Sequence, residues 1–175
     1  MFKLSNYIVF SFFATAALAG NICSYTTRDC VTGIRTCCNN IAEGTCCSWS
    51  STYGWAVKFE NMPLTSWWLG RTYGDTCRTS TSGGGSSGGS TCVTVYPGPN
   101  YLNWKSANWD ADTRSRRSVD NTTSSVELKC AIPNVVEFNT QDGEAHSVTF
   151  TADQADHIHE LVDAGKLEEL LDMYT

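Results

Sequence analysis

Residues 37–47 read Cys-Cys-Asn-Asn-Ile-Ala-Glu-Gly-Thr-Cys-Cys, so two pairs of adjacent cysteines lie in one short polar stretch. The chain has nine cysteines in 175 residues, and eight of them lie between Cys23 and Cys92. This density is typical of disulfide-linked proteins from an oxidising compartment and is rare in the cytosol. We therefore expect an exported chain that is stabilised by disulfides.

The eight clustered cysteines are an even number and can pair among themselves. Adjacent cysteines rarely bond to each other because the required geometry strains the peptide between them, so each member of a pair is expected to have a different partner. The spacing leaves the connectivity open. A metal site is disfavoured because the CxxC pairs of structural zinc sites are missing, and no cofactor is expected. The disulfide candidates are Cys23, Cys30, Cys37, Cys38, Cys46, Cys47, Cys77 and Cys92.

Residues 1–19 have the pattern of a secretory signal peptide. Lys3 supplies a positive start, residues 7–13 begin an apolar run, and Ala17-Leu18-Ala19 matches the small-x-small cleavage pattern. The apolar stretch is shorter than the roughly 20 residues that span a bilayer. We expect cleavage after Ala19, a secreted extracellular product and no stable membrane insertion afterwards.

Charge divides the rest of the chain into two unlike halves. Residues 21–118 carry nine Lys and Arg against six Asp and Glu, whereas residues 119–175 carry two against twelve. The predicted organisation is a cysteine- and tryptophan-rich β domain over residues 20–113, an exposed basic linker over 114–124, and an acidic β-meander with helices over 125–175. Opposite charges favour contact between the halves, and the sequence leaves open whether they form one domain.

Alternating apolar and polar residues predict strands in the first half. Trp55, Val57 and Phe59 alternate with polar positions, and residues 92–96 form a second strand candidate, followed by a turn at residues 97–100. Residues 80–91 are almost entirely Gly, Ser and Thr. That composition predicts a flexible solvated loop, for which a Cys77–Cys92 bridge is one possible closure.

The acidic half shows a strand pattern followed by a helix pattern. Val126, Leu128, Cys130 and Ile132 alternate with charged residues, which predicts a first strand with Cys130 on its buried face. Residues 136–138 and 146–150 predict two more strands joined at Asp142-Gly143, which completes a three-stranded meander.

Helices are predicted from Thr151 to the carboxy terminus. Residues 151–154 form a capping-box sequence, an apolar stripe from Ala155 to Val162 follows, Gly165 ends that helix, and residues 167–171 begin a second one. The predicted fold class is therefore mainly β with a small carboxy-terminal helical element (α+β), stabilised by disulfides.

The histidines give no recognisable catalytic or metal-binding motif. His157 and His159 are two residues apart, so on a helix they face different directions and are expected on its solvated surface. His146 is expected at the rim of its strand. HExxH is absent, and no GxSxG or other recognisable nucleophile motif accompanies any histidine. We expect no enzyme, and the alternative is an extracellular hydrolase whose site is assembled from distant residues.

The first half resembles the small cysteine-rich secreted proteins that are abundant in fungi. The resemblance rests on Asp29-Cys30, on residues 37–47 and on Tyr53-Gly54-Trp55. It implies no particular activity, since that class contains effectors, lectin-like proteins and proteins of other kinds.

Six tryptophans fall in the first half, and four of them suggest a ligand surface. Tryptophan stacks on sugar faces, and nearby asparagines such as Asn103 and Asn108 can bond sugar hydroxyls. Because tryptophan also fills cores, plain core packing is the alternative. The aromatic ligand-surface candidates are Trp67, Trp68, Trp104 and Trp109.

A short basic run lies between the halves. Arg114, Arg116 and Arg117 match the pattern read by subtilisin-like processing proteases, and an intact solvated turn is the alternative. Nucleic-acid binding is disfavoured, since this is one short run in an acidic exported chain. Asn121 begins an N-glycosylation sequence, so the product is expected to be exposed there and to be a glycoprotein in a glycosylating host.

Together these features predict a secreted, disulfide-rich, effector-like binding protein. Its expected partner is an extracellular glycan or a cell-surface protein, and its oligomeric state is open. The alternatives are a precursor of a toxin-like polypeptide cut after Arg117, or the hydrolase described above.

Overall fold

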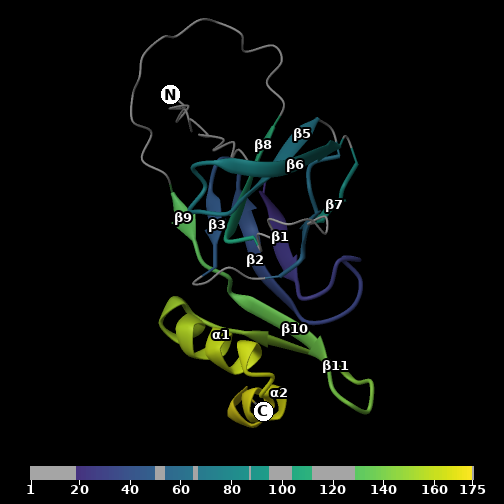
Figure 1. Ribbon diagram of the computed structural model, residues 1–175, viewed down its shortest axis with the longest axis vertical. Coiled ribbons are helices and arrows are strands. Elements are labelled where there is room, and N and C mark those ends of the chain that lie inside the picture. Colours follow the sequence, from purple (N-terminus) through teal and green to yellow (C-terminus); the bar gives the residue numbers. More distant parts are fainter. Residues whose placement is uncertain are drawn as a thin grey trace, which may run out of the picture.

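The computed structural model describes residues 19–49, 54–64, 67–86, 88–94, 104–111 and 129–174. These residues form two β-sheets and two α-helices (Figure 1). The six-stranded sheet has the order β11-β10-β2-β1-β4-β7, and the five-stranded sheet has the order β6-β5-β8-β3-β9. The strands are β1 Ala19–Tyr25, β2 Arg35–Ala42, β3 Cys46–Ser48, β4 Ala56–Glu60, β5 Trp68–Tyr73, β6 Ser80–Ser86, β7 Thr91–Thr94, β8 Ser106–Ala111, β9 Cys130–Ala131, β10 Val135–Asn139 and β11 Ala145–Thr149.

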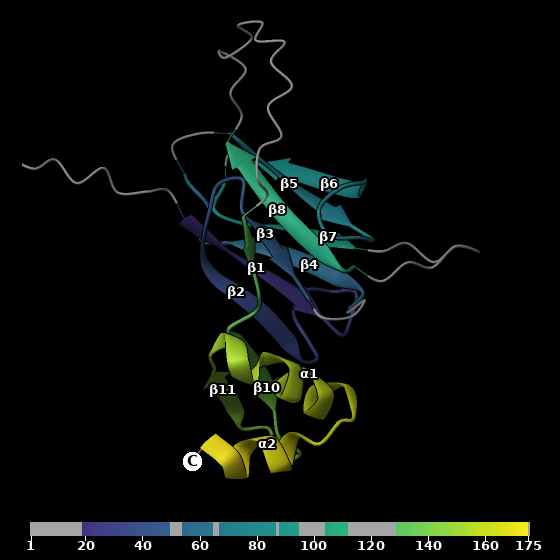
Figure 2. The same ribbon diagram turned by 90° about the vertical axis from the view of Figure 1, so that its left-hand side faces the viewer.

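One face of the six-stranded sheet carries the core. Ile22, Phe59 and Val136 are fully buried on this face, in the same cluster as Trp68 and Trp109 of the five-stranded sheet. The five-stranded sheet covers β1, β2, β4 and β7, and the helices α1 (Ala155–Asp163) and α2 (Leu167–Tyr174) lie beside β10 and β11 (Figures 1 and 2). Among the described residues, no helix or further sheet covers the opposite face of the long sheet, which carries a smaller buried cluster formed by Cys23, Tyr25, Cys30, Cys37, Ala56 and Val135.

Four disulfides join the eight clustered cysteines, as the sequence predicted, and no adjacent pair is bonded to itself. Neighbouring residues on a strand point to opposite faces, so Cys37 and Cys38 of β2 have different partners. The Cys38–Cys47 bridge links β2 to β3 and hence one sheet to the other. The four bonds are Cys23–Cys37, Cys30–Cys92, Cys38–Cys47 and Cys46–Cys77.

The prediction of a flexible Gly/Ser loop at residues 80–91 was wrong for most of that range. Residues 80–86 form β6, which pairs with β5 along its length, and Thr81 Oγ1 donates to the Thr72 carbonyl at 3.0 Å. A Cβ placed on Gly84 would lie 3.1 Å from Cγ2 of Val93, so a larger side chain would crowd β7. Cys77 and Cys92 are not bonded to each other; their partners are Cys46 and Cys30.

The predicted meander of the acidic half was also wrong in its first strand. Among the described residues, that strand is reduced to β9, which pairs in parallel with β3 instead of with β10. Cys130 is exposed rather than buried, and it lies outside the four disulfides. The β10–β11 hairpin is present, with Gly143 in its turn at a positive φ.

The helices of the acidic half begin and end as predicted. Thr151 and Gln154 form the capping box before the 3-10 turn η1 (Ala152–Gln154), and Gly165 follows α1 at φ +69°. His159 is an exception to the expected solvated surface, because it is buried with its ring edge-on to Phe150. His157 is exposed.

Both sheets contain strands from both halves of the chain. β10 pairs with β2, placing Val135 opposite Cys37 and Glu137 opposite Arg35, and β9 pairs with β3. The acidic half therefore completes sheets that the cysteine-rich half begins.

Candidate functional site

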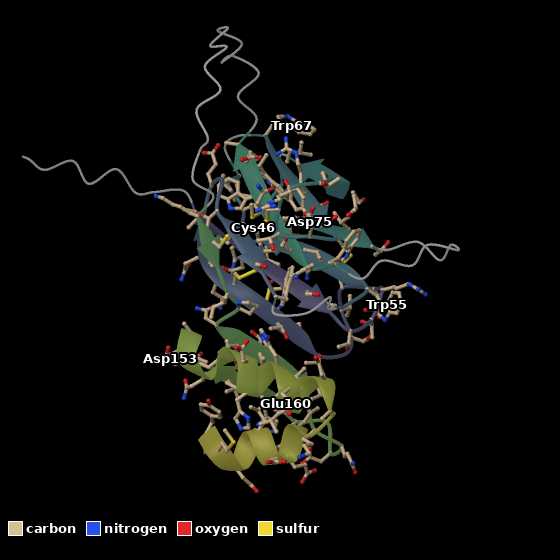
Figure 3. The ribbon with its side chains drawn as sticks, turned by 60° about the vertical axis from the view of Figure 1, so that its left-hand side comes forward. Cys46, Trp55, Trp67, Asp75, Asp153 and Glu160 are labelled. Atoms are coloured by element: carbon tan, nitrogen blue, oxygen red, sulfur yellow. A yellow bond between two sulfur atoms is a disulfide. The ribbon has the colours of Figure 1, made fainter. Side chains whose placement is uncertain are left out.

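Three of the four aromatic ligand-surface candidates belong to the core. Trp68, Trp104 and Trp109 are buried, and the indole N–H groups of Trp68 and Trp109 donate to the carbonyls of Gly88 and Ile41. These positions were wrong as surface candidates, because the core of the sandwich needs large side chains at its centre. Trp67 is 55% exposed and lies at the end of the molecule opposite the helices (Figure 3).

The processing and glycosylation predictions concern residues that the structure does not describe. Arg114, Arg116, Arg117 and Asn121 lie between the described ranges 104–111 and 129–174. They remain predictions from sequence.

Charged side chains collect on the face of the six-stranded sheet that points away from the five-stranded sheet. Alternation along each strand sends Val57 and Phe59 into the core and the side chains of Lys58 and Glu60 outward. We call this surface the charged face. It is formed by Tyr25, Arg35, Lys58, Glu60 and Glu137, which come from β1, β2, β4 and β10.

Arg35 lies at the centre of the charged face. Its Nη1 donates to both carboxylate oxygens of Glu60 at 3.1 Å and to the Tyr25 hydroxyl at 3.2 Å. Its Nη2 lies 2.9 Å from Oε1 of Glu137, and its Nε lies 2.8 Å from Oε2. Burial disfavours the charged form, but the hydrogen bonds to Glu137 and Tyr25 and the charge of Glu60 outweigh it, so the pKa of Arg35 is raised. Both terminal nitrogens of the guanidinium therefore donate to protein groups.

Lys58 completes the ion network on the same face. Its Nζ lies 2.9 Å from Oε1 of Glu60, and this hydrogen bond raises the pKa of Lys58. The Cys23–Cys37 disulfide lies under the network, with Sγ of Cys23 3.9 Å from Oε2 of Glu60. The two cations of the charged face are thus balanced by its two carboxylates.

A hollow of about 280 Å³ opens beside this network. Tyr25, Arg35, Lys58 and Glu137 line its charged side. Val31, which is 79% exposed, belongs to the loop that lines it. Cys30 and Gly33 of the same loop line it too, and the β10–β11 hairpin supplies Phe138, Asn139, Ala145 and His146.

The loop over residues 26–34 is held in place by side-chain bonds. Asp29 accepts hydrogen bonds from the backbone N–H groups of Val31 and Thr32 at 3.0 and 2.9 Å and from the hydroxyls of Thr32 and Thr27 at 2.7 and 2.9 Å. Together these hydrogen bonds hold the pKa of Asp29 well below its ordinary value, and the bond from the Thr32 backbone N–H contributes most. The Cys30–Cys92 bridge ties the loop to β7, so the loop is a preorganised wall.

A second, larger hollow of about 610 Å³ lies at the other side of Lys58. Lys58 and Glu60 line it together with Met62 and the 73% exposed Leu64. Its other lining residues are Asn61, Gly89 and Ser90. Lys58 is therefore common to both hollows.

The described histidines do not assemble a metal centre. His146 lies at the rim, as predicted, with Nε2 3.3 Å from Oγ1 of Thr140 and its ring against Phe138. Burial lowers the pKa of His159. Within the described parts of the chain, no three His, Cys, Asp or Glu side chains are grouped so that they could hold a metal ion.

Sequence reasoning missed the charged face because its residues are dispersed. Glu137 follows Arg35 by 102 residues, and no local motif links them. Alternation alone marks Lys58 and Glu60 as outward-facing, but it does not reveal which strand lies beside β4. The pairing of β2 with β10, which places Glu137 opposite Arg35, cannot be inferred from the alternation of residues.

These features define a disulfide-linked β-sandwich with a helical carboxy-terminal element and a charged, hollowed face. A fungal-type family described as ARB_05566_N, N-terminal domain, matches residues 21–139, and the chain belongs to this family. The match includes Arg35, Lys58, Glu60 and Glu137 and ends at the last residue of β10. No curated protein and no solved structure matches the chain.

Proposed function

We propose that this protein is secreted and acts as an effector-like binding protein, with the charged face as its recognition surface. The observation that supports this proposal is that two open hollows, of about 280 and 610 Å³, share Lys58. Ligand sites are typically concave and largely preformed, with a few polar groups that fix orientation.

Secretion is supported by the disulfides. Four bridges within one small protein are typical of oxidising compartments. No helix in the described part of the chain is long and apolar enough to cross a bilayer. The proposed mature chain begins at Gly20, which lies in β1 and is buried.

Rigidity of the face supports binding. Arg35 of β2 is bonded to Glu137 on the adjacent β10 and to Glu60 on β4, which lies beyond β1, and the Cys30–Cys92 bridge fixes the wall of the smaller hollow. A preorganised surface loses little conformational entropy when a ligand arrives, which favours affinity.

Strand pairing favours a whole-chain binding protein over a precursor that releases its first half. β10 contributes Glu137 to the charged face, and β9 extends the second sheet. A cut after Arg117 would separate these strands from their partners in the covalent chain. A precursor cut after Arg117 remains the alternative. Mass spectrometry of the secreted product tests it, because cleavage would give two fragments in place of one chain.

The binding proposal is tested with rim variants, because Val31 and Leu64 are exposed and their replacement should leave the fold intact. Fluorescently labelled protein is applied to insoluble extracellular polysaccharides and to intact cells bearing surface proteins. We expect Val31→Asp and Leu64→Asp each to reduce the bound fraction, while Met173→Asp on α2, where Met173 is 47% exposed, does not. Equal binding by all four proteins, or no binding to either surface, would contradict the proposal.

A further inference from the structure

The charge balance of the face narrows the class of ligand. We infer that the charged face binds a neutral, hydroxyl-rich oligosaccharide that crosses Lys58 from one hollow to the other. This inference rests on the proposed function above and adds the ligand's chemical class and its path.

Arg35 is a poor receptor for an anionic ligand. Its guanidinium already donates to Glu60 at 3.1 Å and to Glu137 at 2.9 Å. A phosphate, sulfate or carboxylate would have to displace one of these partners and leave a carboxylate without its cation, which carries a large electrostatic cost. The face is therefore not built for a polyanion.

A cationic ligand meets the same obstacle. Both oxygens of Glu60 are engaged, Oε1 by Lys58 at 2.9 Å and both by Arg35. Lys58 would repel an approaching ammonium group at the point where the hollows meet. With two cations and two carboxylates, the face presents no net charge to attract either sign.

Sugar hydroxyls suit this surface because each can donate and accept. Oε2 of Glu60 retains lone-pair capacity because it accepts from Arg35 but not from Lys58, and an ammonium group has three donors, so Glu60 and Lys58 can bind hydroxyls without breaking their ion pair. Asn61 and Ser90 add an amide and a hydroxyl to the lining of the larger hollow. These are the groups that bind a polyol.

Apolar side chains beside the larger hollow provide a complement to sugar C–H faces. Leu64 lines the hollow and lies against the Gly89 position, where a Cβ would be 3.1 Å from its Cδ2. Leu64 is 73% exposed, so it is assigned as the apolar side chain against which a sugar C–H face packs.

The test is titration calorimetry of the full secreted protein with soluble probes. The neutral probes are hexasaccharides of β-1,3-glucan, β-1,4-glucan, chitin and mannan; the charged probes are heparin and hexalysine. Lys58→Met removes the shared ammonium. Lys166→Met on α2 is its matched control, since Lys166 is also ion-paired, with Nζ 3.1 Å from Glu169. Thermal unfolding of each variant verifies that it is folded.

We expect at least one neutral hexasaccharide to bind, about tenfold weaker with Lys58→Met, about fivefold weaker with Leu64→Ala and unchanged with Lys166→Met. If only heparin or hexalysine binds, and Lys58→Met abolishes that binding, the inference of a neutral ligand is wrong. The charged face would still be the recognition surface. Neutral binding that Lys58→Met does not weaken would overturn both the inference and the proposed surface. Failure of every probe would overturn the inference, and the separate rim-variant assay would then decide the proposed function.

Discussion

Arg35 of β2 and Glu137 of β10 are joined by two short contacts, Nη2 to Oε1 at 2.9 Å and Nε to Oε2 at 2.8 Å, although 102 residues separate them. The pair connects the cysteine-rich and acidic halves of the chain on the surface that we propose for recognition. The Nη2 contact is a charge-assisted hydrogen bond, which is stronger than a hydrogen bond between neutral groups, and the Nε contact adds a second close approach of opposite charges.

Loss of one charge from this pair should lower stability. We expect Glu137→Gln to reduce the free energy of unfolding by about 1 kcal/mol, because Glu137 is partly open to water and the full cost of breaking a buried pair does not apply. Glu144→Gln, at an exposed position of the same hairpin, should change it by less than about 0.5 kcal/mol. Urea unfolding measures both, and equal stabilities would show that the pair contributes nothing.

Removal of the acidic half should prevent cooperative folding of the cysteine-rich half. A chain of residues 20–117 lacks β9, β10 and β11, which leaves the edges of β2 and β3 without their partners. It also removes Val136 and Phe138 from the core cluster that includes Cys38 and Trp109. We expect a broad, non-cooperative thermal transition by circular dichroism. A sharp transition like that of the full chain would show that the halves fold independently.

Local patterns were sufficient to predict several elements. The capping box at Thr151, the turn at Gly143 and the alternation at Val57 and Phe59 each depend on neighbouring residues only, and the structure contains the corresponding helix, hairpin and strand. The different partners of Cys37 and Cys38 follow from the opposite directions of adjacent strand residues.

Features that depend on distant partners were not predictable in this way. Residues 80–86 have the composition of a coil, yet β5 supplies a ladder of hydrogen bonds that makes them a strand. Cys130 has the alternation of a buried position, but its short strand joins β3 and leaves it exposed. The charged face depends on strand order, which alternation does not encode.

A close contact between the sheets gives a further prediction. A Cβ on Gly70 of β5 would lie 2.5 Å from ring atoms of Phe59 on β4. We expect Gly70→Ala to lower the free energy of unfolding by about 1–3 kcal/mol through overpacking. Adding Phe59→Leu should relieve the clash, so the double variant should lose less than the sum of the single losses in a double-mutant cycle. Strictly additive losses would contradict this contact.

Buried His159 should make stability depend on pH. Burial beside Phe150 lowers its pKa below the ordinary 6.5, although Asp163 and Asp156 partly oppose this shift. Below about pH 6.5 the unfolded chain binds a proton at this residue more readily than the folded chain does, so stability falls as the pH falls through the folded pKa.

His159→Gln removes this titration. We expect the loss of stability between pH 7.5 and 5.5 to be smaller in His159→Gln than in the parent, and His157→Gln at an exposed position of the same helix to keep the parental slope. Urea unfolding at both pH values measures the free energy of unfolding of each protein. Parallel pH profiles for the parent and His159→Gln would rule out a contribution from His159.

The most direct test of the charged face as recognition surface is an NMR titration of the ¹⁵N-labelled secreted protein with the hexasaccharide that binds it most tightly. The account predicts that backbone amide shifts change at residues 31–35, 58–64 and 88–90, which border the two hollows that share Lys58, while residues 155–174 stay unchanged. Shift changes confined to α1 and α2, with none around Lys58, would contradict it.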